Sequence, residues 1–392
     1  MLQARPCTRP SRAALILSGG GARAAYQAGV LRAIAELLPA GSASPFPIIC
    51  GTSSGAINAT ALAAGACNMQ RACEMLCSVW SSLTVHDIYR ADSAYLLRTG
   101  LRWLRSLLPR GQRPASLLDN TPLARLLARE IAFPAIHDSI ATGALHALAI
   151  TASSYRTGMS VSFCMGAQDL ALWRRAQRVG VRAEIGVPHL IASSAIPLVF
   201  PPAAIDGEFF GDGAINQIAP IAPALHLGAD RVLVVGVAGT GMPPPTPGGK
   251  PPSLAQIGSH VLAAIFTDAL GSDVEKVRFV NDAVRQIPPE RLAASPDPLR
   301  DVDLLVFVPS VSLEALALEY EDRLPGSMRA LLRRLGGTGP GGAGLLSYLL
   351  FDGHFCAALI ELGYRDAKAQ RQPLMRLLQH DPVERSVGMA GA

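Results

Sequence analysis

The sequence predicts an α/β fold of three layers, with a central, mostly parallel sheet between two layers of helices. Near the N-terminus, residues 13–37 and 46–64 each combine a short apolar run, a glycine-rich turn and a helical pattern, which together form a β-α-β-α unit. Residues 229–237 hold a β-branched run typical of a central parallel strand. With 392 residues, of which 49% are hydrophobic and 17% charged, the chain can form one large α/β domain with insertions or two or more domains of average size.

The turns of the β-α-β-α unit are expected at one edge of the sheet. Ala13–Leu17 is the first apolar run, and Gly19, Gly20 and Gly21 turn the chain into a helix whose apolar residues recur every three to four positions. The second run, residues 47–50, leads into another glycine-rich turn. Because parallel strands joined through helices end at the same edge, both turns lie where open α/β sheets bind their ligands.

The second turn, Gly51-Thr52-Ser53-Ser54-Gly55, matches the G-x-S-x-G pattern of a nucleophile elbow. Ser53 stands at the apex of a predicted strand-turn-helix, and Gly51 and Gly55 allow the backbone to bend and its neighbours to approach. The N–H groups at the start of the following helix favour negative charge at the same place. Ser53 is therefore a candidate nucleophile, with an ordinary glycine-serine turn as the alternative.

The first turn has three interpretations. Gly19-x-Gly21-x-x-Ala24 fits a dinucleotide-binding fingerprint, but that site needs an acidic residue at the end of the second strand, where Cys50-Gly51-Thr52 stands instead. Consecutive backbone N–H groups without side chains also suit an oxyanion hole for an ester attacked by Ser53. A plain strand-to-helix turn is the third interpretation, and it is compatible with both functions.

Asp212 is the candidate general base. It lies between Gly211 and Gly213 and beside the apolar Phe209 and Phe210, directly after a predicted hairpin with an Asp-Gly turn. Burial among such neighbours raises the pKa of a carboxyl group and makes its ionised form a stronger base. Another Asp-Gly turn without a catalytic role is the alternative.

Residues 66–130 carry several amphipathic helical patterns, which we expect to cover the sheet or to form a lid. Within them, residues 98–113 hold five arginines and no acidic residue, an excess equal to the formal net charge of +5 of the whole chain. On a helix, Arg98, Arg102 and Arg105 share one face, which suits an anionic membrane surface. A solvated arginine face on an ordinary packed helix is the alternative.

Several stretches are expected to lack regular structure. Glycine and proline predict flexible loops at 238–252 and 336–344, and we expect poorly ordered ends at 1–11 and 369–392. The seven cysteines include no C-x-x-C pair and no cluster with histidine at metal-ligand spacing, so we expect a reducing compartment and no bound metal. No run is suited to a signal peptide or a transmembrane helix, which favours a cytoplasmic protein, peripheral to the membrane at most. The modest positive charge, without a reading motif, argues against nucleic-acid binding.

Three motifs, taken in chain order, resemble those of the patatin-like phospholipase family: Gly19-Gly20-Gly21-x-Arg23, Gly51-Thr52-Ser53-Ser54-Gly55 and Asp212-Gly213-Ala214. The last motif ends in alanine rather than glycine, which the family pattern permits. Segments 192–197, 227–232 and 361–364 also resemble bacterial members, so the likeness extends over roughly residues 12–365. A bacterial source agrees with the composition, because only three of the 35 cationic residues are lysine.

The resemblance implies a patatin-like fold and the hydrolysis of lipid acyl esters, of the phospholipase A or lysophospholipase type, by a Ser53–Asp212 dyad. Asp212 would accept the Ser53 proton directly, and no metal or other cofactor would be needed. Arg23 would brace the glycine turn or add positive potential to it. The implied oxyanion hole is the turn itself, formed by Gly19, Gly20, Gly21, Ala22 and Arg23.

Two other functions stay open at this point. A Ser-His-Asp α/β-hydrolase would use Ser53, Asp212 and a later histidine such as His226, His260 or His354, although only two strands are predicted before Ser53 and that fold has several there. A non-catalytic nucleotide-binding or regulatory module would explain the glycine turn alone. It would not react with fluorophosphonates.

Overall fold

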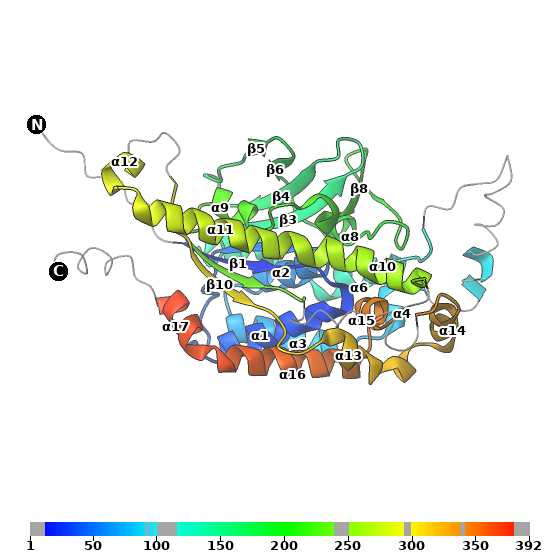
Figure 1. Cartoon of the computed structure of the whole chain (residues 1–392). Coiled ribbons are helices and arrows are strands. Elements are labelled where there is room, and N and C mark those ends of the chain that lie inside the picture. The colour runs from blue at the N-terminus through cyan, green and yellow to red at the C-terminus, as the bar shows by residue number, and fades with distance from the viewer. Residues whose placement is uncertain are drawn as a thin grey trace, which may run out of the picture.

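The computed structural model of the chain has three layers, with one large sheet between two sets of helices (Figure 1). The predicted α/β class with a central sheet is confirmed. The structure describes residues 12–379 with the exception of 91, 93, 96, 100–115, 239–250, 294–298 and 338–341.

The sheet has a parallel half and a mixed half, in which the pairs are antiparallel except for β4 with β6. Its strands are β1 (Ala13–Leu17), β2 (Ile48–Thr52), β3 (Ala147–Ser154), β4 (Ser160–Gly166), β5 (Arg174–Arg175), β6 (Arg178–Arg182), β7 (Ala203–Ile205), β8 (Glu208–Asp212), β9 (Arg231–Val235) and β10 (Asp303–Phe307). Along β10-β9-β1-β2-β3 all neighbours are parallel. Beyond this half, β4 and β8 run antiparallel to β3, β6 pairs with β4, β5 with β6, and β7 with β8. The expected mostly parallel sheet thus describes one half, and the predicted hairpin at Asp206-Gly207 is confirmed.

The parallel half is apolar on both faces because helices cover both. Along β1, Leu15 and Leu17 belong to one buried cluster, whereas Ala14 and Ile16 belong to the cluster on the other face. This two-sided burial explains why the strands appear in the sequence as continuous apolar runs without alternation.

The helical segments are, in chain order, η1 (Gly21–Ala24), α1 (Ala25–Ala35), α2 (Ser54–Ala64), α3 (Met69–Ser82), α4 (Val85–Ile88), α6 (Thr121–Glu130), α7 (Ala135–Ala141), α8 (Val187–Ser193), η2 (Gly213–Asn216), α9 (Ala222–His226), α10 (Leu254–Ala263), η3 (Ala264–Asp268), α11 (Ala269–Gln286), α12 (Pro289–Ala293), α13 (Leu313–Leu318), η4 (Glu321–Arg323), α14 (Gly326–Arg334), α15 (Ala343–Leu349), α16 (Gly353–Ala369) and α17 (Arg371–Gln379). One layer contains α1, α2, α3 and α16, and α9 and α11 cover the opposite face of the sheet.

The helices of residues 66–130, the region expected to cover the sheet or to form a lid, pack mainly against other helices. α3 packs against α1, α2 and α16, with Leu76 and Trp80 buried in the same cluster as β1. α4 and α6 pack against each other beside it. Residues 100–115, which include most of the arginine-rich stretch, lie outside the described residues.

The expected poorly ordered tail from residue 369 onward is wrong over its first part. α17 covers Arg371–Gln379, and its Leu374 and Leu377 are buried in the main core. These leucines are three residues apart and make one helical face apolar, which outweighs the polar composition of the segment. Within the expected loops, residues 239–250 and 338–341 lie outside the described residues, as do 1–11, and α15 begins at Ala343, inside the second loop.

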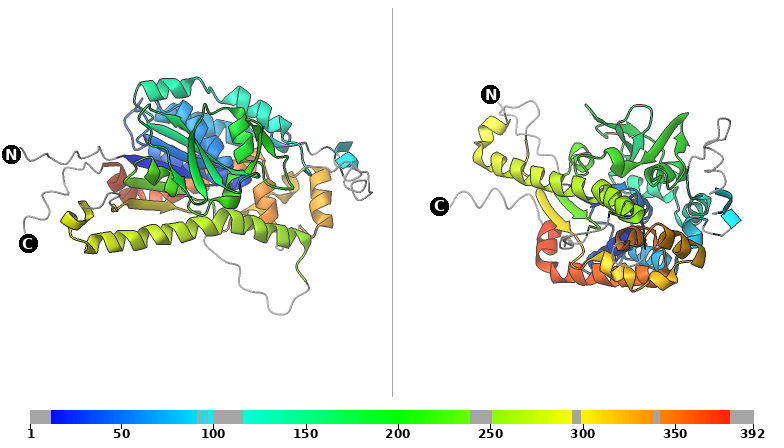
Figure 2. Two further views of the ribbon diagram at one scale, coloured as in Figure 1. Left: turned by 90° about the horizontal axis from the view of Figure 1, so that it is seen from above. Right: turned by 45° about the vertical axis from the view of Figure 1, so that its right-hand side comes forward.

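A continuous helical rod, α10-η3-α11, runs along one side of the molecule (Figure 2). Its middle part, η3, is a π-helical turn. By length and composition this rod, Leu254–Gln286, could cross a membrane, and a quarter of its most apolar window is buried. α15 and α16, which meet at 97°, would pass the same test only as one broken span. A helix of this length and composition is weak evidence for a membrane span, because the core helices of soluble proteins have the same properties.

Candidate active site

Ser53 and Asp212 come together because two strands meet end to end alongside β3. β2 runs parallel to β3 up to the pair Thr52 and Thr151. At the next position of β3, Asp212 of β8 pairs with Ala152 in antiparallel register. The other side of β3 is occupied by β4 along this stretch. β2 and β8 therefore follow one another on the same side of β3, with their carboxyl ends facing each other.

Ser53 has a strained backbone conformation at the apex of the turn after β2. Its φ of 55° and ψ of −130° lie in a region that residues with a side chain rarely adopt. α2 begins at Ser54, so its N-terminus points at the same place. Gly55 is needed because a Cβ there would lie 2.2 Å from the carbonyl oxygen of Leu17. The predicted strand-turn-helix arrangement around Ser53 is thus present.

The segment that begins at Ser193, the last residue of α8, forms hydrogen bonds to the backbone of both Ser53 and Asp212. The Ser193 hydroxyl accepts a hydrogen bond from the Ser53 N–H at 2.9 Å and donates one to the carbonyl oxygen of Thr151 at 2.6 Å. Two residues further on, the carbonyl oxygen of Ala195 accepts a hydrogen bond from the Asp212 N–H at 2.9 Å. This short segment therefore positions the backbone of the serine relative to that of the aspartate.

Ser194, between these anchors, also faces the site. Its hydroxyl is buried, lines the cavity next to Ser53 and has no hydrogen-bond partner among the described residues. Sequence reasoning assigned a role neither to Ser193 nor to Ser194. The segment resembles bacterial family members, but its sequence does not show the hydrogen-bond partners of these hydroxyls, which depend on tertiary contacts.

Asp212 is almost completely buried, with 1% of its surface exposed. Burial raises the pKa of its carboxyl to about 7, although the side-chain interaction with Ser53 and the N–H of Ala214 both act to lower it. Oδ1 accepts the Ala214 N–H at 2.9 Å, whereas Oδ2 has no well-aligned hydrogen-bond donor among the described residues. The Ser53 hydroxyl interacts with this carboxyl, whose charge also acts on Tyr155, and the expected burial of Asp212 is observed.

The glycine turn after β1 lies directly against Ser53. A Cβ placed on Gly19 would lie 2.8 Å from the Ser53 Cβ. The Gly20 N–H donates a hydrogen bond to the Ser54 hydroxyl at 3.1 Å, which ties the turn to the start of α2. Gly21, with φ of 57°, opens the short helix η1, whose first N–H groups have no partner inside the helix.

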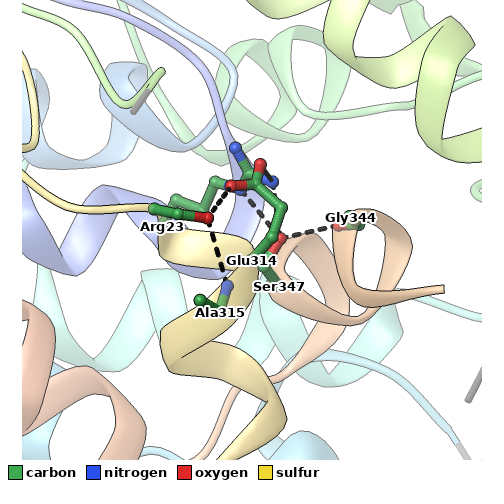
Figure 3. Close-up of polar contacts among 6 residues, drawn as sticks. Arg23, Glu314, Ala315, Gly344 and Ser347 are labelled. Atoms are coloured by element: carbon green, nitrogen blue, oxygen red, sulfur yellow. Dashed lines mark hydrogen bonds and ion pairs between the residues drawn. The ribbon is translucent and has the colours of Figure 1, made fainter. Parts of the chain in front are cut away.

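Arg23 is held from two helices near the C-terminal end of the chain (Figure 3). Its guanidinium donates to the Ser347 hydroxyl of α15 at 2.9 Å through Nε and forms an ion pair with Glu314 of α13 at 2.5 Å. The central carbon of the guanidinium also lies 4.0 Å from the centre of the Tyr348 ring. Burial is the largest single effect on the Glu314 carboxyl and acts to raise its pKa, but the Arg23 charge and the hydrogen bonds to the carboxyl together lower the pKa below its ordinary value. The Arg23 side chain is thus buried and connects the turn to α13 and α15.

An apolar cavity opens at Ser53 and contains about 850 Å³ of empty space, part of it open to solvent. Its polar lining near the turn includes Ser53, Ser54, Asn58 and Ser194, and Glu130 is the one carboxylate among the lining residues that the structure describes. The walls come from α2, α3, α6, α15 and the segment after α8. They include Ile57, Leu76, Trp80, Leu127, Ile196 and Phe351. The cavity thus has the apolar character typical of ligand pockets, with a serine at its polar end.

The three histidines of the alternative triad have other surroundings. His226 stacks on Trp173, His354 lies 3.5 Å from Asp352, and His260 is exposed on α10. No histidine among the described residues contributes to the pKa shift of Asp212. Nor do the described residues contain a group of three or more His, Cys, Asp or Glu able to hold a metal ion.

These observations define a three-layer α/β protein that presents a serine on a strained strand-to-helix turn, next to a buried aspartate and an apolar cavity. The sequence matches the family model of the patatin-like phospholipases over residues 15–225, more than half of its length. The chain belongs to this family. No curated protein matches its sequence.

Solved structures with a similar chain course include human GIVD cytosolic phospholipase A2 in complex with methyl gamma-linolenyl fluorophosphonate. The identity is 14% and the TM-score 0.43, over 95% of this chain and 60% of that one. The complex of SpcU with ExoU, from the type III secretion system of Pseudomonas aeruginosa, shares 17% identity with a TM-score of 0.28, over 93% of this chain and 78% of that one. The chain thus spans about 60% of the length of the human structure.

Proposed function

We propose that the protein is a serine lipid acyl hydrolase of the phospholipase A or lysophospholipase type, with Ser53 as nucleophile and Asp212 as general base. The observation that carries this proposal is the placement of Ser53 between the buried carboxyl of Asp212 and the polar end of an apolar cavity. Membership in the patatin-like phospholipase family supports the same reaction class. The apolar cavity suits the acyl chain of a lipid ester, whose carbonyl carbon would then lie at Ser53.

The reaction starts with the transfer of the Ser53 hydroxyl proton to the ionised Asp212 carboxyl. Ser53 Oγ attacks the ester carbonyl carbon, and the tetrahedral intermediate collapses when the alcohol leaves with the proton from Asp212. Water then loses a proton to Asp212 and attacks the acyl-serine, and the fatty acid leaves as Ser53 regains its proton. A base with a pKa of about 7 is well matched to these transfers near neutral pH.

The oxyanion of each tetrahedral intermediate would be stabilised by N–H groups of the glycine turn. Of the predicted donors, Gly20 already donates to Ser54, and the Arg23 N–H donates to the Gly20 carbonyl oxygen at 3.2 Å. Gly21 and Ala22 open η1, where the first N–H groups lack partners inside the helix, so these two are the preferred donors. The Arg23 side chain would contribute by keeping the turn in place.

The test is fatty-acid release from a panel of phospholipids and lysophospholipids by the wild type, Ser53→Ala and Asp212→Asn, in the presence of EDTA. We expect both variants to lose at least about a thousandfold in kcat/KM, since each removes a reacting group. Asp206→Asn is the matched control, because Asp206 is an exposed carboxylate at the tip of the β7-β8 hairpin. A wild-type rate in Asp212→Asn would restore the histidine triad, and no ester hydrolysis by folded wild type would favour a regulatory or binding module.

A further inference from the structure

The N-terminal part of the rod carries an apolar stripe that faces solvent. Leu254, Ile257 and Val261 are exposed to 69%, 48% and 50%, and Ala264 continues the same face of the helix. Residues 254–267 contain no Asp, Glu, Lys or Arg. Large exposed apolar side chains gathered in one row on an uncharged helix are typical of an interaction surface.

The opposite face of this helix covers the elements that support the candidate active site. Its Leu262 is buried, and α10 packs against α15, which contributes Tyr348 to the cavity wall. In η3, Phe266 stacks on Tyr348 with ring centres 5.5 Å apart, and a Cβ on Gly19 would lie 2.7 Å from the Phe266 ring. The apolar stripe and the glycine turn therefore lie on opposite sides of the same helical segment, α10-η3.

A cationic edge borders the stripe. The Ala255 N–H of α10 donates to the carbonyl oxygen of Leu335 at 3.0 Å, which places the end of α14 beside the start of α10 (Figures 1 and 2). Arg333 and Arg334, in the last turn of α14, are both exposed. An uncharged apolar face next to exposed arginines is complementary to a surface that is apolar inside and anionic at its edge.

We propose that α10 and the end of α14 form a docking surface for an anionic lipid bilayer, with the stripe (Leu254, Ile257 and Val261) inserted at the interface and Arg333 and Arg334 on the headgroups. α11 continues the rod with Asp273, Lys276 and Arg278, and it buries Val274 and Val277 against the sheet. The rod would therefore lie on the membrane rather than cross it. A hydrolase of lipid esters meets its substrate at such a surface, and in this respect the docking surface rests on the proposed function.

The experiment is co-sedimentation of the full chain with vesicles of phosphatidylcholine alone or with one third phosphatidylglycerol. The variant Leu254→Gln/Ile257→Gln/Val261→Gln should need at least about tenfold more lipid for half-maximal binding, because less apolar area is buried. Arg333→Gln/Arg334→Gln should lose about fivefold per arginine, only on the anionic vesicles. Phe279→Gln is the matched control, since Phe279 is 75% exposed on the same rod but about 27 Å from Val261.

Hydrolysis of a soluble, monomeric short-chain ester distinguishes the two proposals. We expect the stripe variant to keep this activity and its melting temperature while it loses vesicle binding. If the wild type binds vesicles but hydrolyses no ester, the proposed function fails and the docking surface stands. The docking surface is wrong if the stripe variant binds vesicles as the wild type does, if Phe279→Gln reduces binding equally, or if only Arg98→Gln/Arg102→Gln/Arg105→Gln does so. The docking surface is also wrong if the wild type is a dimer in solution and the only effect of the stripe variant is to make it a monomer.

Discussion

The backbone around Ser53 is formed by neighbours in sequence and is then anchored by distant residues such as Ser193, whereas Asp212 reaches the site only through pairing of segments far apart in the chain. β2, the strained turn and the start of α2 occupy consecutive residues around Ser53, and the glycine turn comes one helix earlier. Asp212 ends a hairpin strand that is placed by β3, and its N–H is held by Ala195. Ser53 is thus positioned mainly by its local turn, while the Asp212 carboxyl obtains its raised pKa from tertiary burial.

The first prediction, with the largest expected effect, concerns stability and tests whether Asp212 is a buried ionising group. In Asp212→Asn the free energy of unfolding should exceed that of the wild type by about 2 to 4 kcal/mol at pH 8, because an ionised buried carboxyl is removed. The folded wild type keeps its Asp212 proton up to a pKa of about 7, whereas the ordinary value is 3.8. Wild-type stability therefore falls as pH rises between these values, and the advantage of the variant should shrink at pH 5.

Urea unfolding of both proteins at the two pH values measures this difference, with Asp206→Asn as the exposed control. If Asp212→Asn were destabilised equally at both pH values, Asp212 would not be a buried, ionising group, and the proposed difference between the two sides would be wrong.

The second prediction concerns the pH dependence of activity. In the proposed mechanism Asp212 accepts the Ser53 proton only when it is ionised, so kcat/KM should rise about tenfold per pH unit below pH 7 and level off above it. Initial rates with a soluble ester between pH 5 and 9 provide the profile. His354→Gln should leave it unchanged, because His354 is exposed beside Asp352. A shifted midpoint in that variant would point to a histidine base.

The third prediction concerns the brace of the glycine turn, on the Ser53 side. Glu314→Gln removes the carboxylate partner of the buried Arg23, which should cost about 1 to 2 kcal/mol and lower kcat severalfold with little change in KM. The control is Glu361→Gln, because Glu361 is exposed and its partner Arg32 is only half-buried, with an expected cost below about 0.5 kcal/mol. Thermal melts and steady-state kinetics measure both. Equal costs in the two variants would mean that the Arg23 brace has no special role.

The smallest effect tests the strain at Ser53. Because its φ is 55°, Ser53→Gly should be more stable than Ser53→Ala by about 0.5 to 1 kcal/mol, although both lack the hydroxyl. Denaturant unfolding of the two variants at one pH suffices. An alanine variant as stable as the glycine variant would show that the turn is not strained, and local strain could then not distinguish the two sides.

The sequence by itself determined the elements whose signals are local. Apolar runs, glycine turns and helical spacing predicted the β-α-β-α unit, the turn around Ser53 and the hairpin before Asp212, because these depend on backbone sterics and on the period of apolar residues. The same local signals failed for the tail, where α17 depends on burial of Leu374 and Leu377 against the core.

Only the tertiary structure decided how these parts combine. No sequence signal shows that β2 and β8 meet along β3, or that Ser193 holds the Ser53 N–H from 140 residues away. The pKa of Asp212, the ion pair that holds Arg23 and the apolar cavity depend likewise on which distant groups exclude water from one place. Residue types and their spacing specify local conformation, whereas burial and long-range partners arise only when the chain is packed.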